Sequence, residues 1–266
     1  MRNVLKVSIA LVALVIFVSA VGLLYPEIYR ATSPNWLAQS VGQDGVDLFL
    51  IVPVLIFGTI YSFNSKRVAV YLWLGTLLYL VYTFLIYCFA VRFNALFLPY
   101  CLILGVSFFS FAWFFSGNKD RFYGSTRNKV LNVVGIYFIV ISVAFYALWL
   151  FEVIPAAFND EVPLSIREAG LFTNPVHVLD LSLFLPGTFM AGVLALRRTL
   201  LSTVLSPVLL TFFILMDLTI AALSIIMVLK DVGGSYTVAA VMICLAVFTL
   251  LLLVSYLRND HHKANT

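Results

Sequence analysis

Eight long apolar stretches, separated by short polar connections, account for most of the sequence. They cover approximately residues 7–24, 48–63, 68–91, 95–115, 130–151, 181–196, 205–229 and 235–257. A helix needs roughly 17–25 residues to cross the hydrocarbon core of a membrane, and most of the stretches are near that length. Because a segment in lipid must satisfy its own backbone hydrogen bonds, we predict an all-α, polytopic transmembrane bundle of about eight helices.

The composition agrees with this class and argues against others. Charged residues make up only 11% of the 266 residues, whereas soluble domains contain about 25%. The formal net charge of +4 comes from short clusters between apolar stretches rather than from one basic face. We therefore expect no nucleic-acid partner. The expected partners are the lipid bilayer and a small molecule, a lipid or another membrane protein.

The sequence lacks the common catalytic and cofactor motifs. It contains no H-E-x-x-H, no G-x-x-x-x-G-K-[ST] and no G-x-S-x-G, so an enzyme is the least favoured class, with no catalytic residue or cofactor predicted. Cys88, Cys101 and Cys244 lie inside apolar stretches and form neither a disulfide framework nor a C-x-x-C metal site. We interpret them as small core residues.

The distribution of basic residues predicts the orientation. If the N-terminus is inside, twelve of the sixteen Lys and Arg residues fall in inner segments and four in outer segments. The inner set is Arg2, Lys6, Lys66, Arg67, Lys119, Arg121, Arg127, Lys129, Arg197, Arg198, Arg258 and Lys263, and the outer set is Arg30, Arg92, Arg167 and Lys230. The positive-inside rule then predicts a plasma (inner) membrane protein with both termini in the cytoplasm.

The first apolar stretch allows one alternative. Positive residues before it and the small residues at 18–20 are typical of a cleavable signal peptide, and cleavage would leave seven spans. The apolar stretch continues through residues 21–24, which favours an uncleaved helix.

A short segment occurs twice in the chain. Residues 46–53 (VDLFLIVP) align with residues 179–186 (LDLSLFLP), and the offset of 133 (180 minus 47) is half of 266. The dibasic pairs at 66–67 and 197–198 follow each copy. We predict two four-helix repeats, residues 1–125 and 126–266. Four crossings separate them, so the repeats should share one orientation about an axis along the membrane normal.

Two outer connections are long enough to contain structure. In residues 25–45, Ser33 and Pro34 are typical of a helix start, and Trp36 is typical of an interface anchor. In residues 152–178, Ser165 to Glu168 matches a capping box. We expect both connections to form short interfacial helices over the outer face.

Asp217 lies near the centre of the seventh apolar stretch. A charged carboxylate there costs about 2.5–3.5 kcal/mol on insertion scales, so this side chain must face the bundle. One interpretation is a protonated or hydrogen-bonded carboxyl that joins helices through a Tyr or Ser. The other is a proton-coupling or substrate-contact group.

Acidic residues and prolines recur at the second and sixth stretches. Asp47 and Asp180 mark their outer starts, and Asp44 and His177 lie three residues earlier on the same helical face. Such acids can simply cap a helix. A paired ligand site is the alternative, because both stretches are short and should be interrupted by a proline, Pro53 or Pro186. A metal site from these four side chains has suitable ligand types, but one histidine supports it weakly.

The third stretch carries hydroxyl groups on one face: Tyr79, Tyr82, Thr83 and Tyr87. Core packing explains such residues most simply. Under the duplication the third helix corresponds to the seventh, so these tyrosines are also the expected partners of Asp217.

Two functional classes therefore remain. The first is a small transporter, or a membrane component of one, with a polar site between the repeats. The second is a non-catalytic sensor or assembly factor that uses the outer helices to bind a partner.

Overall fold

The computed structural model of the protein describes residues 2–62, 67–117, 125–126 and 128–261. In this part of the chain, eight helices are long and apolar enough to cross a membrane. They cover Lys6–Leu24, Pro34–Tyr61, Arg67–Ala90, Phe97–Gly117, Lys129–Phe158, Pro175–Leu196, Ser202–Leu229 and Tyr236–Arg258. The prediction of an all-helical bundle with eight membrane-compatible helices is confirmed.

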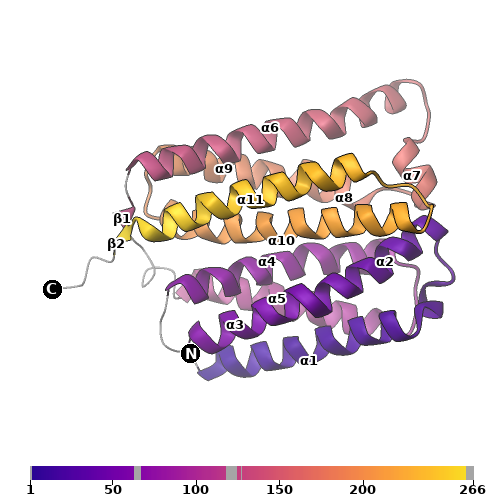
Figure 1. Ribbon diagram of the computed structural model, residues 1–266, viewed down its shortest axis with the longest axis horizontal. Helices are drawn as coiled ribbons and strands as arrows, with labels where there is room; N and C mark the ends of the chain where they lie inside the picture. The colour runs from indigo at the N-terminus through magenta and orange to yellow at the C-terminus, as the bar shows by residue number, and fades with distance from the viewer. Residues whose placement is uncertain (1, 63–66, 118–124, 127, 262–266) are drawn as a thin grey trace.

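The secondary-structure elements follow one another with short connections (Figure 1). In chain order they are α1 (Arg2–Leu24), η1 (Pro26–Tyr29), α2 (Pro34–Val46), η2 (Asp47–Ile51), α3 (Val52–Ser62), α4 (Arg67–Ala90), α5 (Phe97–Gly117), β1 (Ser125–Thr126), α6 (Asn128–Phe158), α7 (Leu164–Ala169), α8 (Pro175–Leu179), η4 (Asp180–Phe184), α9 (Leu185–Leu196), α10 (Ser202–Leu229), α11 (Tyr236–Arg258) and β2 (Asp260–His261). The two-residue segments β1 and β2 pair antiparallel.

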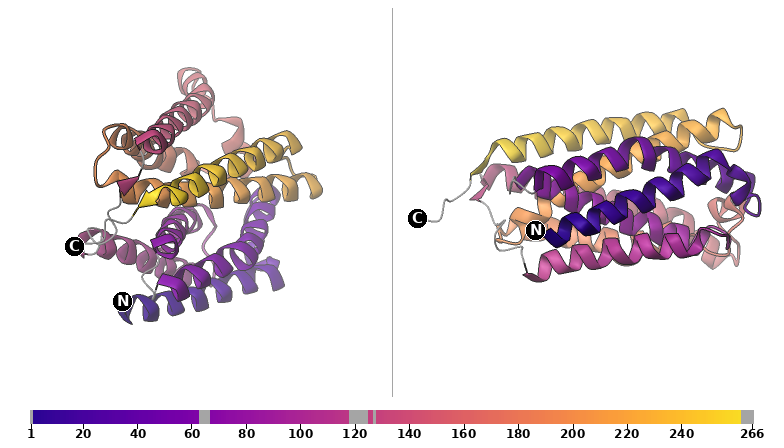
Figure 2. Two further views of the ribbon diagram at one scale, coloured as in Figure 1. Left: turned by 60° about the vertical axis from the view of Figure 1, so that its left-hand side comes forward. Right: turned by 90° about the horizontal axis from the view of Figure 1, so that it is seen from below.

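The helices of the two sequence halves lie on opposite sides of the bundle. Figures 1 and 2 show α1–α5 on one side and α6–α11 on the other, with both chain ends at the same end of the bundle. The halves meet mainly where α4 packs against α10, while α2 contacts α10 and α8 contacts α4. At the crossing, a Cβ on Gly75 would lie 2.5 Å from Thr211 Cβ, so glycine permits the close approach of α4 and α10.

Helix α4 is the centre of this arrangement. Across its apolar stretch 78% of the residues are buried, whereas the values for the other seven spans are 22–39%. Those seven expose many large apolar side chains, such as Phe49, Leu98 and Phe151, on the outside of the bundle. Lipid is the environment that accommodates such a surface. The hydroxyl-bearing residues that the sequence singled out on α4 are therefore inside the bundle, as their spacing indicated: Tyr79, Tyr82, Thr83 and Tyr87.

The second and sixth spans differ from the sequence prediction. Residues 34–61 form one continuous helical span, so the expected interfacial helix in residues 25–45 is instead the first part of the second span. Ser33 does cap it, because its side chain accepts a hydrogen bond from the backbone of Trp36, but Trp36 is buried and not an interface anchor. The polar residues of α2 made this segment look like a connection in the sequence. In the structure they point into the bundle, so the segment can still be part of a membrane helix. Both spans are longer than predicted, 28 and 22 residues.

Neither proline interrupts its span. A π-helical turn lies just before each one, Asp47–Ile51 before Pro53 and Asp180–Phe184 before Pro186. Proline cannot donate a backbone hydrogen bond. In the wider π-helical turn the backbone hydrogen bonds span one residue more than in an α-helix, and the helix continues past the proline. In the second copy the carbonyl of Leu181 is left for another donor, and the hydroxyl of Tyr146 donates to it at 2.5 Å.

Two other local predictions have different outcomes. Helix α7 exists, but it begins at Leu164, so Ser165 lies inside it and forms no capping box. Helix α1 packs against α2, α3 and α5, with Leu11 and Val15 fully buried, as the first helix of a bundle would. Lys66, Lys119, Arg121, Arg127 and Lys263 of the charge count lie outside the described residues.

Candidate functional site

The hydroxyl groups of three tyrosines of α4 each lie within hydrogen-bonding distance of a different aspartate, of which Asp44 and Asp47 are buried and Asp180 is half-buried. The pairs are Tyr79 with Asp47 (3.2 Å), Tyr82 with Asp180 (2.9 Å) and Tyr87 with Asp44 (3.1 Å). Two of these aspartates belong to the first half and one to the second. One helix therefore holds carboxyl groups of both halves, and the tyrosines that we expected to contact Asp217 contact other aspartates.

The Asp47 cluster also connects α2, α4 and α10. The side-chain amide of Gln43 donates to Asp47 Oδ1 at 2.9 Å and to the Tyr79 hydroxyl at 2.6 Å. Tyr79 lies 2.9 Å from the hydroxyl of Thr219, which itself donates to the carbonyl of Leu215. Since a hydroxyl has one proton, Tyr79 satisfies either Asp47 or Thr219 at a time. The second oxygen of Asp47 is buried without a hydrogen-bond partner in the described structure.

Two tyrosine hydroxyls lie at the carboxyl group of Asp44. Tyr29 donates to Asp44 Oδ2 at 2.7 Å. The hydroxyl of Tyr87 lies 3.1 Å from Asp44 Oδ1 and 3.0 Å from the carbonyl oxygen of Ser40, so its single proton is shared between these two acceptors. Burial, and next the neighbouring Asp44 carboxyl, raises the pKa of the Tyr29 hydroxyl, which therefore remains a donor. A Cβ on Gly22 would lie 1.8 Å from Asp44 Oδ2. Asp44 of α2 thus contacts α1 and α4 and stabilises the packing of the three helices.

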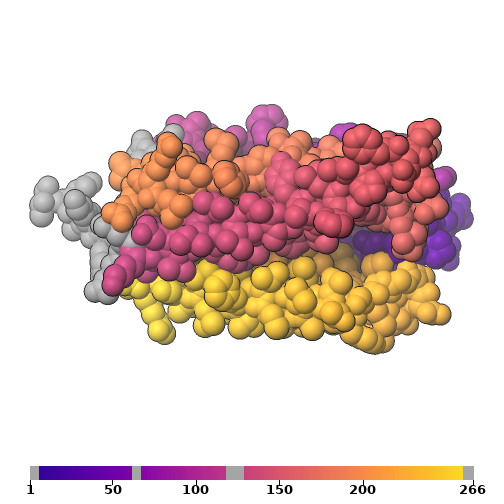
Figure 3. Space-filling model, turned by 90° about the horizontal axis from the view of Figure 1, so that it is seen from above, coloured from indigo at the N-terminus to yellow at the C-terminus, as the bar shows by residue number. Residues whose placement is uncertain are grey.

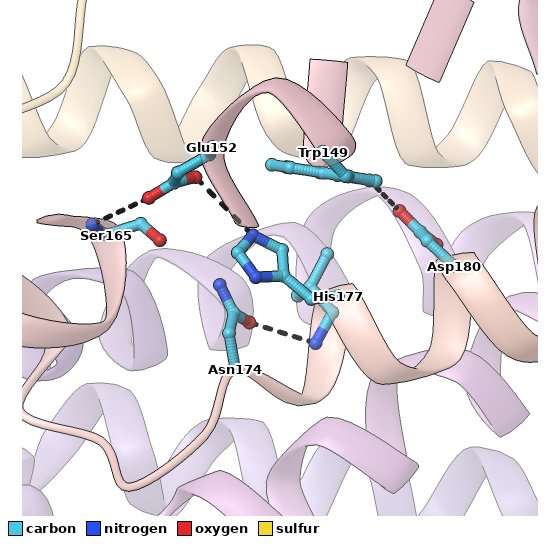
Figure 4. A network of polar contacts seen from close by, with 7 residues as sticks. Trp149, Glu152, Ser165, Asn174, His177 and Asp180 are labelled. Carbon is cyan, nitrogen blue, oxygen red and sulfur yellow. Dashed lines mark hydrogen bonds and ion pairs between the residues drawn. The ribbon is translucent and has the colours of Figure 1, made fainter. Parts of the chain in front are cut away.

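Asp180 and His177 of the second half belong to another polar network (Figure 4). The indole of Trp149 donates to Asp180 Oδ2 at 2.8 Å. His177 Nε2 lies 3.6 Å from Glu152 Oε2, and the other oxygen of Glu152 accepts a hydrogen bond from the backbone of Ser165. Asn174 caps α8 next to them. Asp180 and His177 therefore join α6 to α8 and to the start of α7.

These contacts argue against the metal site considered above. Asp44 and Asp47 are paired with tyrosine and amide groups. His177 Nε2 is buried without a hydrogen-bond partner in the described structure, and its nearest carboxylate oxygen is that of Glu152 at 3.6 Å. No group of three or more His, Cys, Asp or Glu side chains within the described residues could hold a metal ion.

A cavity of about 590 Å³ lies between the two halves. Its lining comes from α2 and α4 of the first half and from α6, α7, α8, α10 and α11 of the second. Polar groups include Gln39, Ser40, Gln43, Thr83, Thr219 and Ser224; aromatic groups are Trp36, Tyr82, Tyr87 and Trp149; apolar groups include Ile86, Val91, Met216, Ile220, Leu223 and Met227. None of the described residues that line it is charged.

The cavity lies on the side of the bundle opposite to the chain ends. Its lining includes Ser165 of α7 and Gly234 and Ser235 of the α10–α11 connection. In the space-filling view a hollow lies between α6 and α11 toward α7, and atoms of the first half are visible at its bottom (Figure 3). The cavity is therefore bounded by long apolar helices on its sides and, at its end, by the connections on the side opposite to the chain ends.

Asp217 lines a second, smaller cavity of about 60 Å³. Asp180, Tyr82 and Thr188 line it as well, and it shares Tyr82, Met216 and Ile220 with the large cavity. Asp217 is only 4% exposed, and its Oδ2 has no hydrogen-bond partner in the part of the chain that the structure describes. The prediction that Asp217 points into the bundle is confirmed, but its expected tyrosine partner is not found.

Several residues of these networks were not predicted from the sequence. They are Tyr29, Gln43, Trp149, Glu152 and Thr219. Gln43 lies one helical turn before Asp47, a spacing that could have been recognised. The others are remote from their partners in sequence, and only the packing of the helices brings them together.

The comparisons with known proteins give no family for this chain. No protein-family model matches it, and no curated protein or solved structure is significantly similar to it.

Replacing Tyr82 by Phe tests whether the α4 tyrosines stabilise the bundle. The change removes one of the two donors to Asp180, and we expect the free energy of unfolding in micelles to fall by about 0.5–2 kcal/mol. Tyr236→Phe, at an exposed tyrosine of α11, is the matched control and should change it by less than about 0.5 kcal/mol. Equal effects of the two changes would contradict this role for Tyr82.

Proposed function

We propose that this multi-pass membrane protein is a small transporter, or a membrane component of one, that takes an amphipathic small molecule into the cavity between its halves. The observation that carries the proposal is the 590 Å³ cavity lined by both halves. This volume is in the range of pockets that enclose small molecules.

The lining favours a ligand with a neutral polar group and an apolar body. The side-chain oxygen of Gln43 and the hydroxyls of Thr83 and Thr219 supply hydrogen-bonding groups, whereas Leu223 and Met227 supply apolar surface. A charged ligand would meet no countercharge among the described lining residues. The hollow between α6 and α11 would let an amphipathic molecule enter from the membrane as well as from the outer end.

Asp217 is the candidate coupling group. It is buried, carries an oxygen without a partner, and borders a small cavity that shares three residues with the large one. The small cavity at Asp217 has room for water, since one water molecule needs about 10–15 Å³. We propose that a proton is taken up or released at Asp217 when the neighbouring cavity fills or empties.

Two further proposals concern architecture. We propose that residues 1–125 and 126–266 are parallel repeats, supported by the π-helical turn before Pro53 and Pro186 and by the reciprocal packing of α2 on α10 and of α8 on α4. We also propose that both termini are in the cytoplasm of a plasma (inner) membrane protein, on the basis of the basic residues in the connections.

A sensor or assembly factor is the second candidate function. Its support is that the outer connections are structured and form hydrogen bonds across the two halves. Ser33 donates to the carbonyl of Ala169 at 2.7 Å, and Asn35 donates to the carbonyl of Val232 at 2.8 Å. These connections could present a surface to a partner protein. A small molecule in the cavity would then be the signal that the protein senses.

Filling the cavity tests the binding site. Leu223→Trp places a larger side chain against the cavity, and we expect it to abolish the stabilisation that a neutral probe, a medium-chain monoacylglycerol, gives to the purified protein. Saturating probe should raise the free energy of unfolding by about 2–3 kcal/mol at one hundred times its Kd.

The matched control is Leu251→Trp on the lipid-facing side of α11, where Leu251 is 62% exposed. It should keep the stabilisation, and equal responses of the two variants would contradict the site. Saturable binding by the parent without movement of the probe across proteoliposomes would favour the sensor.

Asp217→Asn tests the coupling. Asparagine keeps the shape and hydrogen bonding of the side chain but cannot titrate. We expect the variant to fold like the parent and to bind the probe, while the pH dependence of probe movement is lost. Asp160→Asn in an exposed outer connection is the control and should behave like the parent. An unchanged pH dependence in Asp217→Asn would exclude Asp217 as the coupling group.

A further inference from the structure

Two cysteines that are remote from any motif lie side by side at one end of the bundle. Cys88 is near the end of α4, and Cys101 is near the start of α5, the next helix of the chain. Their Sγ atoms are 3.9 Å apart, and both side chains are half-buried. Cys244, the third cysteine, is exposed on α11 and has no such neighbour among the described cysteines.

We propose that Cys88 and Cys101 are a modification site that is oxidised to an intramolecular disulfide in the mature protein. A disulfide has an S–S length of about 2.0 Å, so the two sulfur atoms must approach by roughly 2 Å. The two residues lie on adjacent helices that a short connection, residues 91–96, joins. The two sulfur atoms already make van der Waals contact at 3.9 Å, and the remaining approach is smaller than this distance.

The surroundings of the pair favour oxidation over metal binding. A structural metal site needs additional ligands, and the described residues offer no group of three or more His, Cys, Asp or Glu. Both cysteines are half-buried rather than sealed in the packed core. Core packing, which the sequence suggested for these cysteines, is the alternative interpretation, and it predicts two free thiols.

The location also fits an oxidising compartment. Cys88 follows Tyr87, whose hydroxyl contacts the Asp44 to which Tyr29 of the connection after α1 also donates. The pair is thus at the end of the bundle opposite to the chain termini. In the orientation proposed above this end is outside, where disulfides form and persist.

The reaction balances with a protein disulfide as oxidant. One thiolate of the pair attacks that disulfide, forms a mixed disulfide and expels one sulfur as a thiolate. The second cysteine attacks the mixed disulfide, which forms the Cys88–Cys101 bond and releases the oxidant as a dithiol. The pair loses two electrons and two protons, and the oxidant gains them.

The bond would fix the outer end of α4, the helix that carries the tyrosines of the candidate site. Tyr87 and Tyr100, the residues directly before the two cysteines, already pack with their ring centres 5.0 Å apart. A cross-link at the next position would hold α4 and α5 in this arrangement. Such a bond would stabilise the packing of α4 against α5 whatever molecule the cavity binds.

Differential alkylation of the full-length protein tests the proposal. Cells that express it are quenched in acid, and free thiols are blocked with N-ethylmaleimide under denaturing conditions, so that burial protects no thiol. After reduction, a maleimide–polyethylene glycol reagent marks each cysteine that had been oxidised. We expect two added labels per chain on a monomer, and none when reduction is omitted.

The variants identify the pair. Cys244→Ser should keep both labels, whereas Cys88→Ser and Cys101→Ser should each lose both. If either single variant does not fold, peptide mapping of the Cys244→Ser protein must find Cys88 linked to Cys101. Complete blocking of both thiols in the parent, or a disulfide between two chains, would overturn the proposal.

Discussion

A carboxyl group inside a membrane needs hydrogen-bond donors or a cation, and the apolar stretches of this chain contain no lysine or arginine. The donors are instead tyrosine, tryptophan and amide groups, and α4 supplies three of them. These hydroxyls reach aspartates in both halves, and 78% of the residues in the apolar stretch of α4 are buried. The central position of α4 in the bundle agrees with this requirement.

The same requirement separates two kinds of carboxyl group. Asp44 and Asp180 have partners on both oxygens and connect helices. Asp47 and Asp217 each keep one buried oxygen without a partner in the described structure. A buried polar atom without a partner is costly, so it indicates water, a proton or a ligand nearby. Asp217 is the stronger candidate, because it borders a cavity next to the proposed binding site.

Much of the fold could be predicted from the sequence because lipid imposes a simple rule of length and apolarity. Six stretches satisfied this rule directly, whereas the second and sixth were predicted too short. The first part of the second span was missed because Gln39, Gln43 and Asp44 make it look like a polar loop. The effect of Pro53 and Pro186 was also misjudged. Sequence shows that proline removes a hydrogen bond, but not that a π-helical turn will absorb the change.

The site could be predicted only in part. Helical spacing correctly placed Tyr79, Tyr82 and Tyr87 inside the bundle, and Asp217 as well. It could not choose their partners, because hydrogen bonds between helices depend on how α4, α8 and α10 cross. The contact between Cys88 and Cys101 was missed for the same reason, since thirteen residues of separation form no motif.

The central claim is that a cavity accessible to small molecules lies against α4 between the two halves. The most direct measurement is the reaction of single cysteines with a small methanethiosulfonate reagent, in a chain whose native cysteines are replaced by serine. Thr83 lines the cavity, whereas Thr76 on the same helix is fully buried in packed core. The account predicts that Thr83→Cys reacts readily and Thr76→Cys does not. Equal resistance of the two positions would contradict it.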